Sequence, residues 1–209
     1  MNIIILTDEL DEDFEGELIS ECLGDLPKEK AGKVICMIPK NAPHNASSTE
    51  TAKACSLDAE VITSEERAKG AVCTALFAID DINNEDELLV IYRPLVRADV
   101  CAAVGDFRQR DLDGGLVTFP SAQPGHTWVV LDETDRVIRA DERCPVSNHA
   151  AAGYYYFRRG SDFVNACFAV IERDPSSEQP YNLPSTYNEL ILQQKNIGIF
   201  QFPEPSSPS

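Results

Sequence analysis

The sequence predicts an α/β domain built on a doubly wound, mixed but mostly parallel sheet, with an antiparallel hairpin in its second half. Three observations lead to this prediction. Short apolar runs alternate with helical patterns through the first 95 residues. Repeated strand–helix–strand crossovers of this length join parallel strands. Two strand-like runs then flank the turn DETD at 132–135, which is typical of a hairpin.

Four apolar runs in the first half have the length and composition of buried strands. They are Asn2–Leu6, Lys33–Ile38, Glu60–Thr63 and Glu87–Tyr92. Helical patterns lie between them over about 14–22 and 68–79, where apolar residues recur at intervals of three or four. A short helix is also expected over about 48–55.

The second half predicts five further strands and two helices. The strands are Gly115–Phe119, Thr127–Leu131, Arg136–Ala140, Ala151–Arg158 and Ile197–Phe202. Ser161 and Asp162 are expected to cap the first helix. The second helix is expected to open at Thr186, with Glu189 completing a capping box. We therefore expect one domain over 1–202 and a disordered tail over 203–209, because PEPSSPS has no apolar residue.

The composition is strongly acidic. With 35 Asp and Glu against 18 Lys and Arg, the formal net charge is −17. Such a surface repels phosphate backbones and anionic lipids, so nucleic acid and membranes are poor partners. No apolar run approaches the roughly 18 residues of a membrane span, and the amino-terminal residues lack a basic segment before their apolar run. The chain is expected to be cytoplasmic.

Seven cysteines are scattered without C-x-x-C spacing. An odd count at wide intervals argues against a disulfide framework and against a zinc site. Most of them lie in apolar stretches, where a free thiol behaves as a small hydrophobic side chain. Reduced thiols agree with a cytoplasmic location.

The run from about Gly70 to Phe202, over half of the chain, carries a family resemblance in four stretches. They are KGAVCTALFAIDDINNEDELLV, DGGLVTFPSAQPGHTWVVLDETDRV, RADERCPVSNHAAAGYYYFRRGSDFVNA and YNLPSTYNELI. Their order and spacing resemble the small nucleotidyltransferases that activate sugar phosphates for capsule and cell-surface polysaccharides. The resemblance implies a Rossmann-like sheet of the GT-A type. It further implies a degenerate nucleotide-binding half over 1–95 and a sugar-binding-like half over 96–202.

The loop after the first strand departs from this family. Members carry a glycine-rich segment and a lysine there, because backbone N–H groups and cations hold the triphosphate. This chain has TDELDEDFEGE, with seven carboxylates and one glycine between Asp8 and Glu17. Such a loop repels a polyphosphate unless metal ions intervene, and a solvated acidic face is its simpler interpretation.

The end of the fourth strand departs as well. The family has a magnesium-binding aspartate there, and magnesium requires hard oxygen ligands in tight geometry. Alignment of ELLVI on the family's strand puts Tyr92, Arg93 and Pro94 at the acidic motif, and none of them offers a carboxylate. The nearest candidate, Asp99, lies about one helical turn too late. No metal ligand is therefore assigned.

Other parts of the family's pattern are retained. Gly70 and Thr74 match a G-x-x-x-T loop that reads the base, so they are predicted to bind the nucleotide. Four residues are predicted to bind the sugar phosphate: Glu142, Arg143, Gly153 and Asn188. Arginine can replace the family's lysine toward phosphate, with different geometry. The alternative is that these residues only shape the fold.

The resemblance and its departures together imply a nucleotidyltransferase-like pseudoenzyme. It would bind a nucleotide or sugar phosphate, or serve as an accessory subunit, and no cofactor is evident. One alternative is an active sugar-phosphate nucleotidyltransferase whose Mg²⁺ site draws on Asp8, Asp11 or Asp99. Another is a structural partner of an active homologue, in which association with that homologue or as a homo-oligomer is the function.

Overall fold

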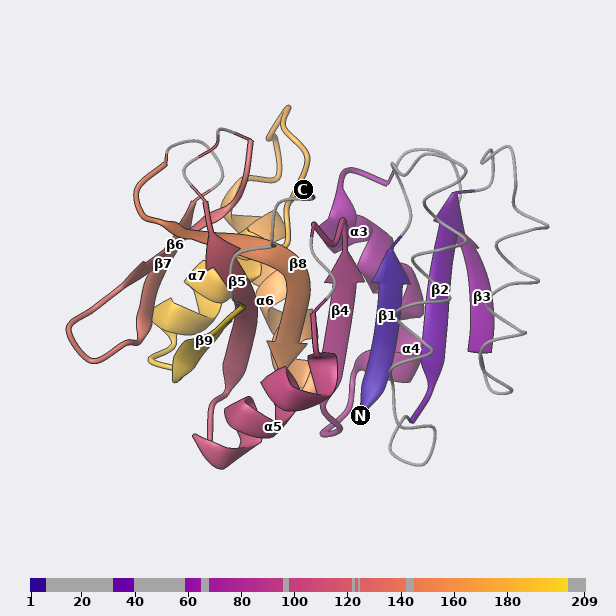
Figure 1. Ribbon diagram of the computed structural model, residues 1–209. Coiled ribbons are helices and arrows are strands. Elements are labelled where there is room, and N and C mark those ends of the chain that lie inside the picture. The colour runs from indigo at the N-terminus through magenta and orange to yellow at the C-terminus, as the bar shows by residue number, and fades with distance from the viewer. Residues whose placement is uncertain are drawn as a thin grey trace, which may run out of the picture.

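The computed structural model describes residues 1–6, 32–39, 59–64, 68–95, 98–121, 123, 125–141 and 145–202. Within this part, nine strands form one sheet (Figure 1). Its main path runs β3-β2-β1-β4-β8-β5-β9, and β6 and β7 join it at β8. The predicted α/β class, with a mixed and mostly parallel sheet, is confirmed. The helices expected over 14–22 and 48–55, and the tail, lie outside the described residues.

The parallel part of the sheet is built by the first half of the chain. It consists of β1 (Asn2–Leu6), β2 (Val34–Pro39), β3 (Ala59–Ser64) and β4 (Leu88–Tyr92). In the centre, β1 pairs in parallel with β2 and β4, so that Ile5 lies opposite Cys36 and Ile91. Every residue of β1 is buried. A strand covered on both faces needs a continuous apolar run, which is why NIIIL has no alternation.

The second half adds antiparallel strands. The strand β8 (His149–Phe157) pairs antiparallel with both β4 and β5 (Gly114–Pro120), while β9 (Ile197–Gln201) runs parallel to β5. The predicted hairpin is confirmed as β6 (Trp128–Leu131) and β7 (Val137–Asp141). The aromatic run 154–157 of β8 is buried throughout, as a central strand requires.

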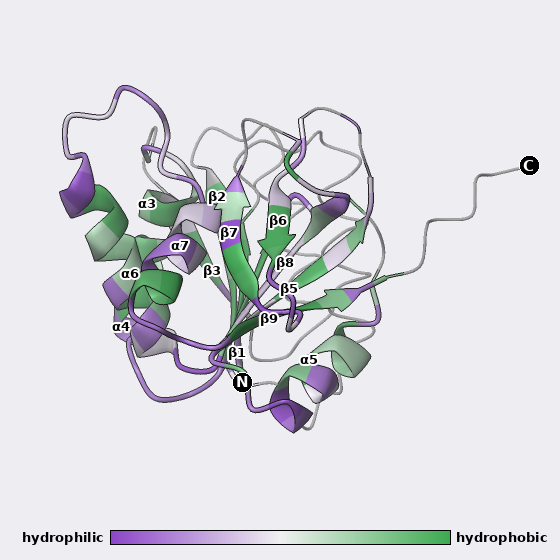
Figure 2. Cartoon of the chain, turned by 90° about the vertical axis from the view of Figure 1, so that its left-hand side faces the viewer, coloured by the Kyte–Doolittle hydropathy of each residue, from purple (hydrophilic) through white to green (hydrophobic). Residues whose placement is uncertain are grey.

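Helices cover both faces of the sheet, as Figure 2 shows edge-on. One face carries α3 (Ala71–Ala75), the short 3₁₀ turn η1 (Leu76–Ala78), α4 (Ile79–Ile82), α6 (Gly160–Arg173) and α7 (Pro184–Leu192). The other face is covered by α5 (Val100–Gln109). Each face has its own apolar core, and α5 contributes Val104 and Phe107 to the second one. The helical stripe expected over 68–79 is therefore three short segments.

Three helices, α5, α6 and α7, differ from the sequence prediction. The helix α5 was not predicted, although Asp99 caps it by accepting the N–H of Ala102 at 2.9 Å. The helix α6 starts at Gly160 without a side-chain cap. Asp162 lies inside its first turn, where its carboxylate accepts from Arg159 at 2.9 Å, so the predicted Ser161 and Asp162 caps are wrong.

The start of α7 also differs. This helix begins at Pro184, and the hydroxyl of Thr186 donates to the carbonyl of Leu183 at 2.6 Å. No capping box forms, because the carboxylate of Glu189 accepts from the guanidinium of Arg173 at 2.6 Å. A long-range ion pair thus replaces the local contact that the sequence pattern predicted.

Candidate functional site

The carboxyl ends of β1, β2 and β4 lie at one edge of the sheet. Leu6 is paired with Met37 on one side and with Tyr92 on the other, so β1 and β4 end together and β2 ends two residues further on. Their arrowheads point to the top of Figure 1. Ligands of doubly wound sheets bind beyond this edge. We call it the carboxyl edge, and it is the candidate site.

Arg93 is the first residue beyond β4 at the carboxyl edge. Its backbone has φ 46°, a left-handed conformation that non-glycine residues adopt infrequently. Its exposed guanidinium carbon lies 5.3 Å from the centre of the Tyr92 ring, which is cation–π range. Sequence reasoning placed Arg93 here only as a residue that cannot bind metal. The structure shows a cation held at the end of a central strand.

Gly153 packs directly against this segment. Its φ is +93°, and a Cβ at this position would lie 2.6 Å from the Cα of Pro94 and 2.6 Å from the carbonyl oxygen of Tyr92. The register between β5 and β8 shifts next to it, between Leu116 and Thr118. A glycine is required because β8 bulges against the backbone of β4's end. Contact of Gly153 with a sugar phosphate stays a prediction.

Gly70 and Thr74 form a tight turn at the start of α3. Gly70 has φ +92°, and a Cβ there would lie 2.5 Å from the carbonyl oxygen of Tyr181. The hydroxyl of Thr74 donates to the carbonyl of Gly70 at 3.2 Å. Lys69 places its ammonium 5.2 Å from the centre of the Tyr181 ring. The turn is thus pinned to the segment before α7, and its predicted nucleotide contact stays a prediction.

Cys73 lies within the same turn of helix and is half-buried. Burial raises the pKa of its thiol, although the backbone and charge of Lys69 act in the opposite direction. Burial likewise raises the pKa of the Cys167 thiol, which is fully enclosed. A raised pKa keeps a thiol protonated and poorly nucleophilic. These two cysteines therefore act as apolar packing groups and not as nucleophiles.

Asn188 lies on α7 and is bonded to the hairpin. Its side-chain amide donates to the carbonyl of Ala140 at 2.9 Å, and its oxygen accepts the N–H of Ala140 at 2.9 Å. Both backbone groups of one β7 residue are thus satisfied by a single side chain. The predicted Glu142 and Arg143 lie outside the described residues. Asn188 holds α7 to the strand that leads into them, and its own ligand contact stays a prediction.

The described part of the carboxyl edge does not fit a magnesium ion. Neither Arg93 nor Pro94 supplies an oxygen ligand from its side chain, and Asp99 is used as the cap of α5. Among the described residues, no group of three or more His, Cys, Asp and Glu side chains could hold a metal ion. The acidic loop with Asp8 and Asp11 lies outside the described residues.

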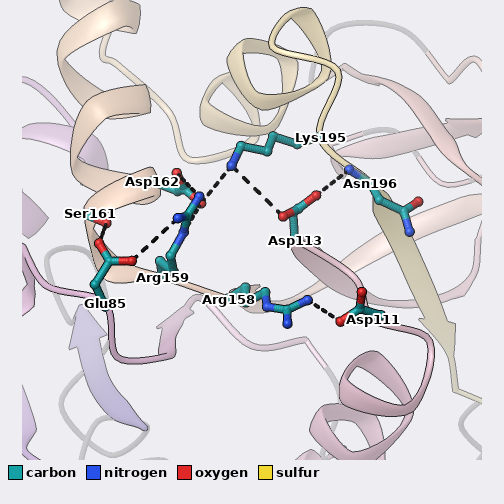
Figure 3. Close-up of polar contacts among 9 residues, drawn as sticks. All are labelled: Glu85, Asp111, Asp113, Arg158, Arg159, Ser161, Asp162, Lys195 and Asn196. Atoms are coloured by element: carbon teal, nitrogen blue, oxygen red, sulfur yellow. Dashed lines mark hydrogen bonds and ion pairs between the residues drawn. The ribbon is translucent and has the colours of Figure 1, made fainter.

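A second polar cluster lies at the opposite edge of the sheet, near the amino end of β5 (Figure 3). Lys195 lies 3.2 Å from the carboxylate of Asp162 and 4.0 Å from that of Asp113. Asp113 also accepts the N–H of Asn196 at 2.8 Å, and Asp111 is paired with Arg158. The cluster joins β5, α6 and the turn before β9. Its carboxylates are paired with lysine and arginine side chains, so the cluster stabilises the packing of these elements and is not a metal site.

In the part of the chain that the structure describes, three buried side-chain polar atoms have no hydrogen-bond partner. They are Thr118 Oγ1, Trp128 Nε1 and His149 Nδ1. Each lies where β5, β6 and β8 meet, because Trp128 is paired with Ala150 and Thr118 with Ala151. His126 covers this junction with its ring centre 5.5 Å from that of Phe119. Sequence reasoning assigned these residues no catalytic or binding role.

Comparison with known proteins identifies solved structures of the same fold, but no match at the level of family models or curated proteins. No family model matches the chain, and no curated protein matches it significantly. A nucleoside-diphosphate-sugar pyrophosphorylase from Vibrio cholerae RC9 has a TM-score of 0.75 at 15% identity, over 98% of this chain and 93% of that one. The inositol-1-phosphate CTP transferase from T. maritima gives 0.68 at 12%, over 97% and 86%.

A UDP-glucose pyrophosphorylase complexed with UDP-glucose gives a TM-score of 0.68 at 9% identity, over 97% of this chain and 90% of that one. The class is therefore that of α/β proteins with a nucleotidyltransferase-like fold. More narrowly, the chain is structurally similar to sugar-phosphate nucleotidyltransferases over nearly its whole length. Within the described residues, no helix is long and apolar enough to cross a membrane.

Proposed function

We propose that the chain binds a nucleotide or a sugar phosphate on its nucleotidyltransferase fold without catalysing magnesium-dependent transfer. The observation that carries this proposal is the end of β4. There Arg93 and Pro94 follow Tyr92, and the backbone of all three residues is packed against Gly153. A cation and a proline thus occupy the position at which the resemblance implies a metal-binding aspartate.

The physical reason is the charge that nucleotidyl transfer develops. The leaving pyrophosphate and the transferred phosphate both need compensation, which a coordinated divalent ion supplies most directly. Magnesium is held at about 2.0–2.1 Å in near-octahedral geometry, so a distant carboxylate cannot substitute for one at the strand end. The tight contact at Gly153 also fixes the local backbone. The chain therefore retains a place for an anionic ligand and not the ion that drives its reaction.

The affinity should be modest. A net charge of −17 repels anions over the whole surface, while Arg93 and Lys69 offer local attraction near the carboxyl edge. Attraction between exposed charges is screened by salt.

Calorimetric titration tests the proposal with the four common nucleoside triphosphates and with hexose 1-phosphates, each in EDTA and in Mg²⁺. A coupled pyrophosphate assay runs in parallel. We expect binding of at least one compound in EDTA and no pyrophosphate release. Magnesium-dependent release would overturn the proposal in favour of an active transferase, whose rearranged metal site the Asp8→Ala, Asp11→Ala and Asp99→Ala variants would then locate.

Absence of any binding would also overturn it. In that case the interpretation as an accessory or structural partner would be favoured. Light scattering coupled to size-exclusion chromatography, alone and with an active homologue, would then decide it. A strict monomer that forms no complex would contradict that interpretation as well.

A further inference from the structure

We propose that Trp128 determines which ligand the chain accepts, by donating its indole N–H to a hydroxyl group of a bound sugar phosphate. This inference rests on the proposed function, because it chooses the sugar phosphate over the nucleotide and names a residue that recognises it. The observation behind it is a buried donor without an acceptor. Trp128 is 1% exposed, and its Nε1 has no hydrogen-bond partner among the described residues. Such groups are uncommon in folded proteins and call for an explanation.

Trp128 lies in a row of three residues across neighbouring strands. Ala150 of β8 is paired with Phe119 of β5 on one side and with Trp128 of β6 on the other, so the three side chains share one face of the sheet. A single methyl group thus lies between two large aromatic side chains. We call Phe119, Ala150 and Trp128 the aromatic row. Apolar and aromatic side chains with one well-placed polar group are the usual lining of a site for a small molecule.

The aromatic row lies at the end of the sheet where ligands are expected. The strands β4 and β5 run in the same direction, because each is antiparallel to β8. Phe119 is the last residue but one of β5, so the row lies at the carboxyl end of that strand. Thr118 and His149 belong to the opposite face, since Thr118 is paired with Ala151 and His149 lies two residues from Ala151. Their unpartnered atoms are therefore not part of the row.

The ring of His126 covers the aromatic row in this structure. Its centre lies 5.5 Å from that of the Phe119 ring and 6.3 Å from that of the Trp128 ring. The residue before it, Gly125, has φ +96°, and a Cβ there would meet nothing within 4 Å. His126 is partly exposed, and exposed side chains change rotamer readily. A ligand ring that takes the place of this imidazole would contact the same two aromatic side chains and bring an acceptor to Nε1.

The chemistry of the aromatic row favours the sugar part of the ligand. An indole N–H is a neutral donor, so it does not compensate the charge of a phosphate group. A sugar ring has apolar C–H faces that pack against aromatic side chains, and the hydroxyl groups at its edge accept hydrogen bonds. One hydroxyl group is enough to satisfy Nε1. A ligand without this hydroxyl would leave the buried donor unpaired, which is how a site rejects such analogues.

Nuclear magnetic resonance of the wild-type chain tests the inference directly. Trp128 is the only tryptophan, so its indole N–H gives a single resonance. We expect hexose 1-phosphates to move this resonance downfield, because the proton becomes hydrogen-bonded. Inorganic phosphate has no ring and should leave it in place. A resonance that stays in place while a hexose 1-phosphate binds, or that reports a bound water only, would overturn the inference.

Two variants measure the contributions of the donor and of the covering ring. Trp128→Phe keeps an aromatic ring and removes the N–H, so it should weaken binding of hexose 1-phosphates by about three- to tenfold. That loss should disappear for the monodeoxy sugar phosphate that lacks the bonded hydroxyl. His126→Ala removes the ring that competes with the ligand and should tighten binding by about two- to fivefold.

The matched control is Tyr156→Phe. It removes a hydroxyl, which donates to Glu87 at 2.8 Å, from an aromatic residue of the same core that is paired with Gly115 near the other end of β5. This variant should bind like the wild type. Circular dichroism checks that each variant is folded. If Trp128→Phe does not fold, the indole resonance of the wild type and the affinity of His126→Ala decide the question.

The outcomes separate this inference from the proposed function. Equal affinities of the wild type and folded Trp128→Phe for every hexose 1-phosphate would overturn the role of Trp128 and leave the proposed function intact. Nucleotides that move the indole resonance, while hexose 1-phosphates do not, would overturn the choice of ligand. Weaker binding by His126→Ala would overturn the displacement of its ring. No binding of any compound by the wild type would overturn the proposed function and this inference together.

Discussion

Gly153 and Pro94 approach so closely that a Cβ on the glycine would lie 2.6 Å from the Cα of the proline. The first residue belongs to β8 and the second follows β4, so the contact joins the two halves of the chain. It places β8 of the second half directly against the end of β4 in the first half. The geometry of the candidate site depends on this one contact.

Replacement of Gly153 by alanine should therefore destabilise the fold by about 2 kcal/mol or more, because φ +93° is strained for alanine and its methyl group meets backbone atoms. Urea denaturation followed by circular dichroism measures the change. The matched control is Gly105→Ala in α5, where a Cβ meets nothing within 4 Å. That substitution should stabilise by about 0.5–1 kcal/mol. Equal effects of the two substitutions would contradict the contact.

The buried hydroxyl of Thr118 has no partner, and the residue is 0% exposed. Thr118→Val keeps the shape of the side chain and removes the unsatisfied group. The free energy of unfolding should rise by about 1 kcal/mol. Denaturant melts of the two proteins check this. A loss of stability would show that the hydroxyl has a partner in solution, such as a bound water.

Asn188 bonds both backbone groups of Ala140. Asn188→Ala should cost about 1–3 kcal/mol, because the N–H and C=O of Ala140 lose their partner. If Asn188 acts only through the hairpin, the affinity for ligand should follow the folded fraction of the protein. Calorimetry at a temperature where the variant is fully folded separates the two effects. A tenfold loss of affinity there would support the predicted contact with the sugar phosphate.

The ionisation of Glu87 should make the free energy of unfolding depend on pH in the acidic range. Burial opposes its ionisation, but bonds from Arg108 at 2.7 Å and from the Tyr156 hydroxyl at 2.8 Å outweigh burial, and the pKa of Glu87 is lowered. A carboxyl group with a lowered folded-state pKa contributes stability above its unfolded value, near 4.5. That contribution is lost as the pH falls through the folded value.

The stability difference between wild type and Glu87→Gln should therefore be complete at neutral pH and shrink progressively below about pH 4.5. Urea melts at a series of pH values measure it. Glu133→Gln, at an exposed hairpin turn, controls for the loss of one surface carboxylate. A difference that stays constant down to strongly acidic pH would contradict the coupling with Arg108 and Tyr156.

Much of the fold could be predicted from the sequence, because apolar runs report burial directly. The strand β1 was placed residue for residue, since NIIIL can only be covered on both faces. The helix α5 was missed. Its amphipathic pattern is only ten residues long, and it follows a segment around Asp99 that was considered only as a source of metal ligands. The starts of α6 and α7 were misplaced because the two carboxylates bond to side chains instead of to local backbone. Asp162 accepts from the neighbouring Arg159 and the distant Lys195, and Glu189 accepts from the distant Arg173.

The candidate site was less predictable. Gly70 and Gly153 were singled out by a family pattern, and the left-handed backbone that makes each of them necessary depends on tertiary contacts with Tyr181 and Pro94. The left-handed backbone of Arg93 could not be predicted, because an arginine after a strand carries no signal about φ. Only the packing of β8 against β4 shows that this cation is held in place.

Arg93 gives the last prediction, which concerns stability alone. A left-handed conformation costs a non-glycine residue about 1–2 kcal/mol, and glycine avoids this cost while gaining freedom in the unfolded chain. Arg93→Gly should therefore raise the free energy of unfolding by a few tenths to about 1 kcal/mol, whereas Arg93→Ala should not. Thermal and urea melts of both variants measure the difference. Equal stability of the glycine and alanine variants would show that the backbone at 93 relaxes in solution.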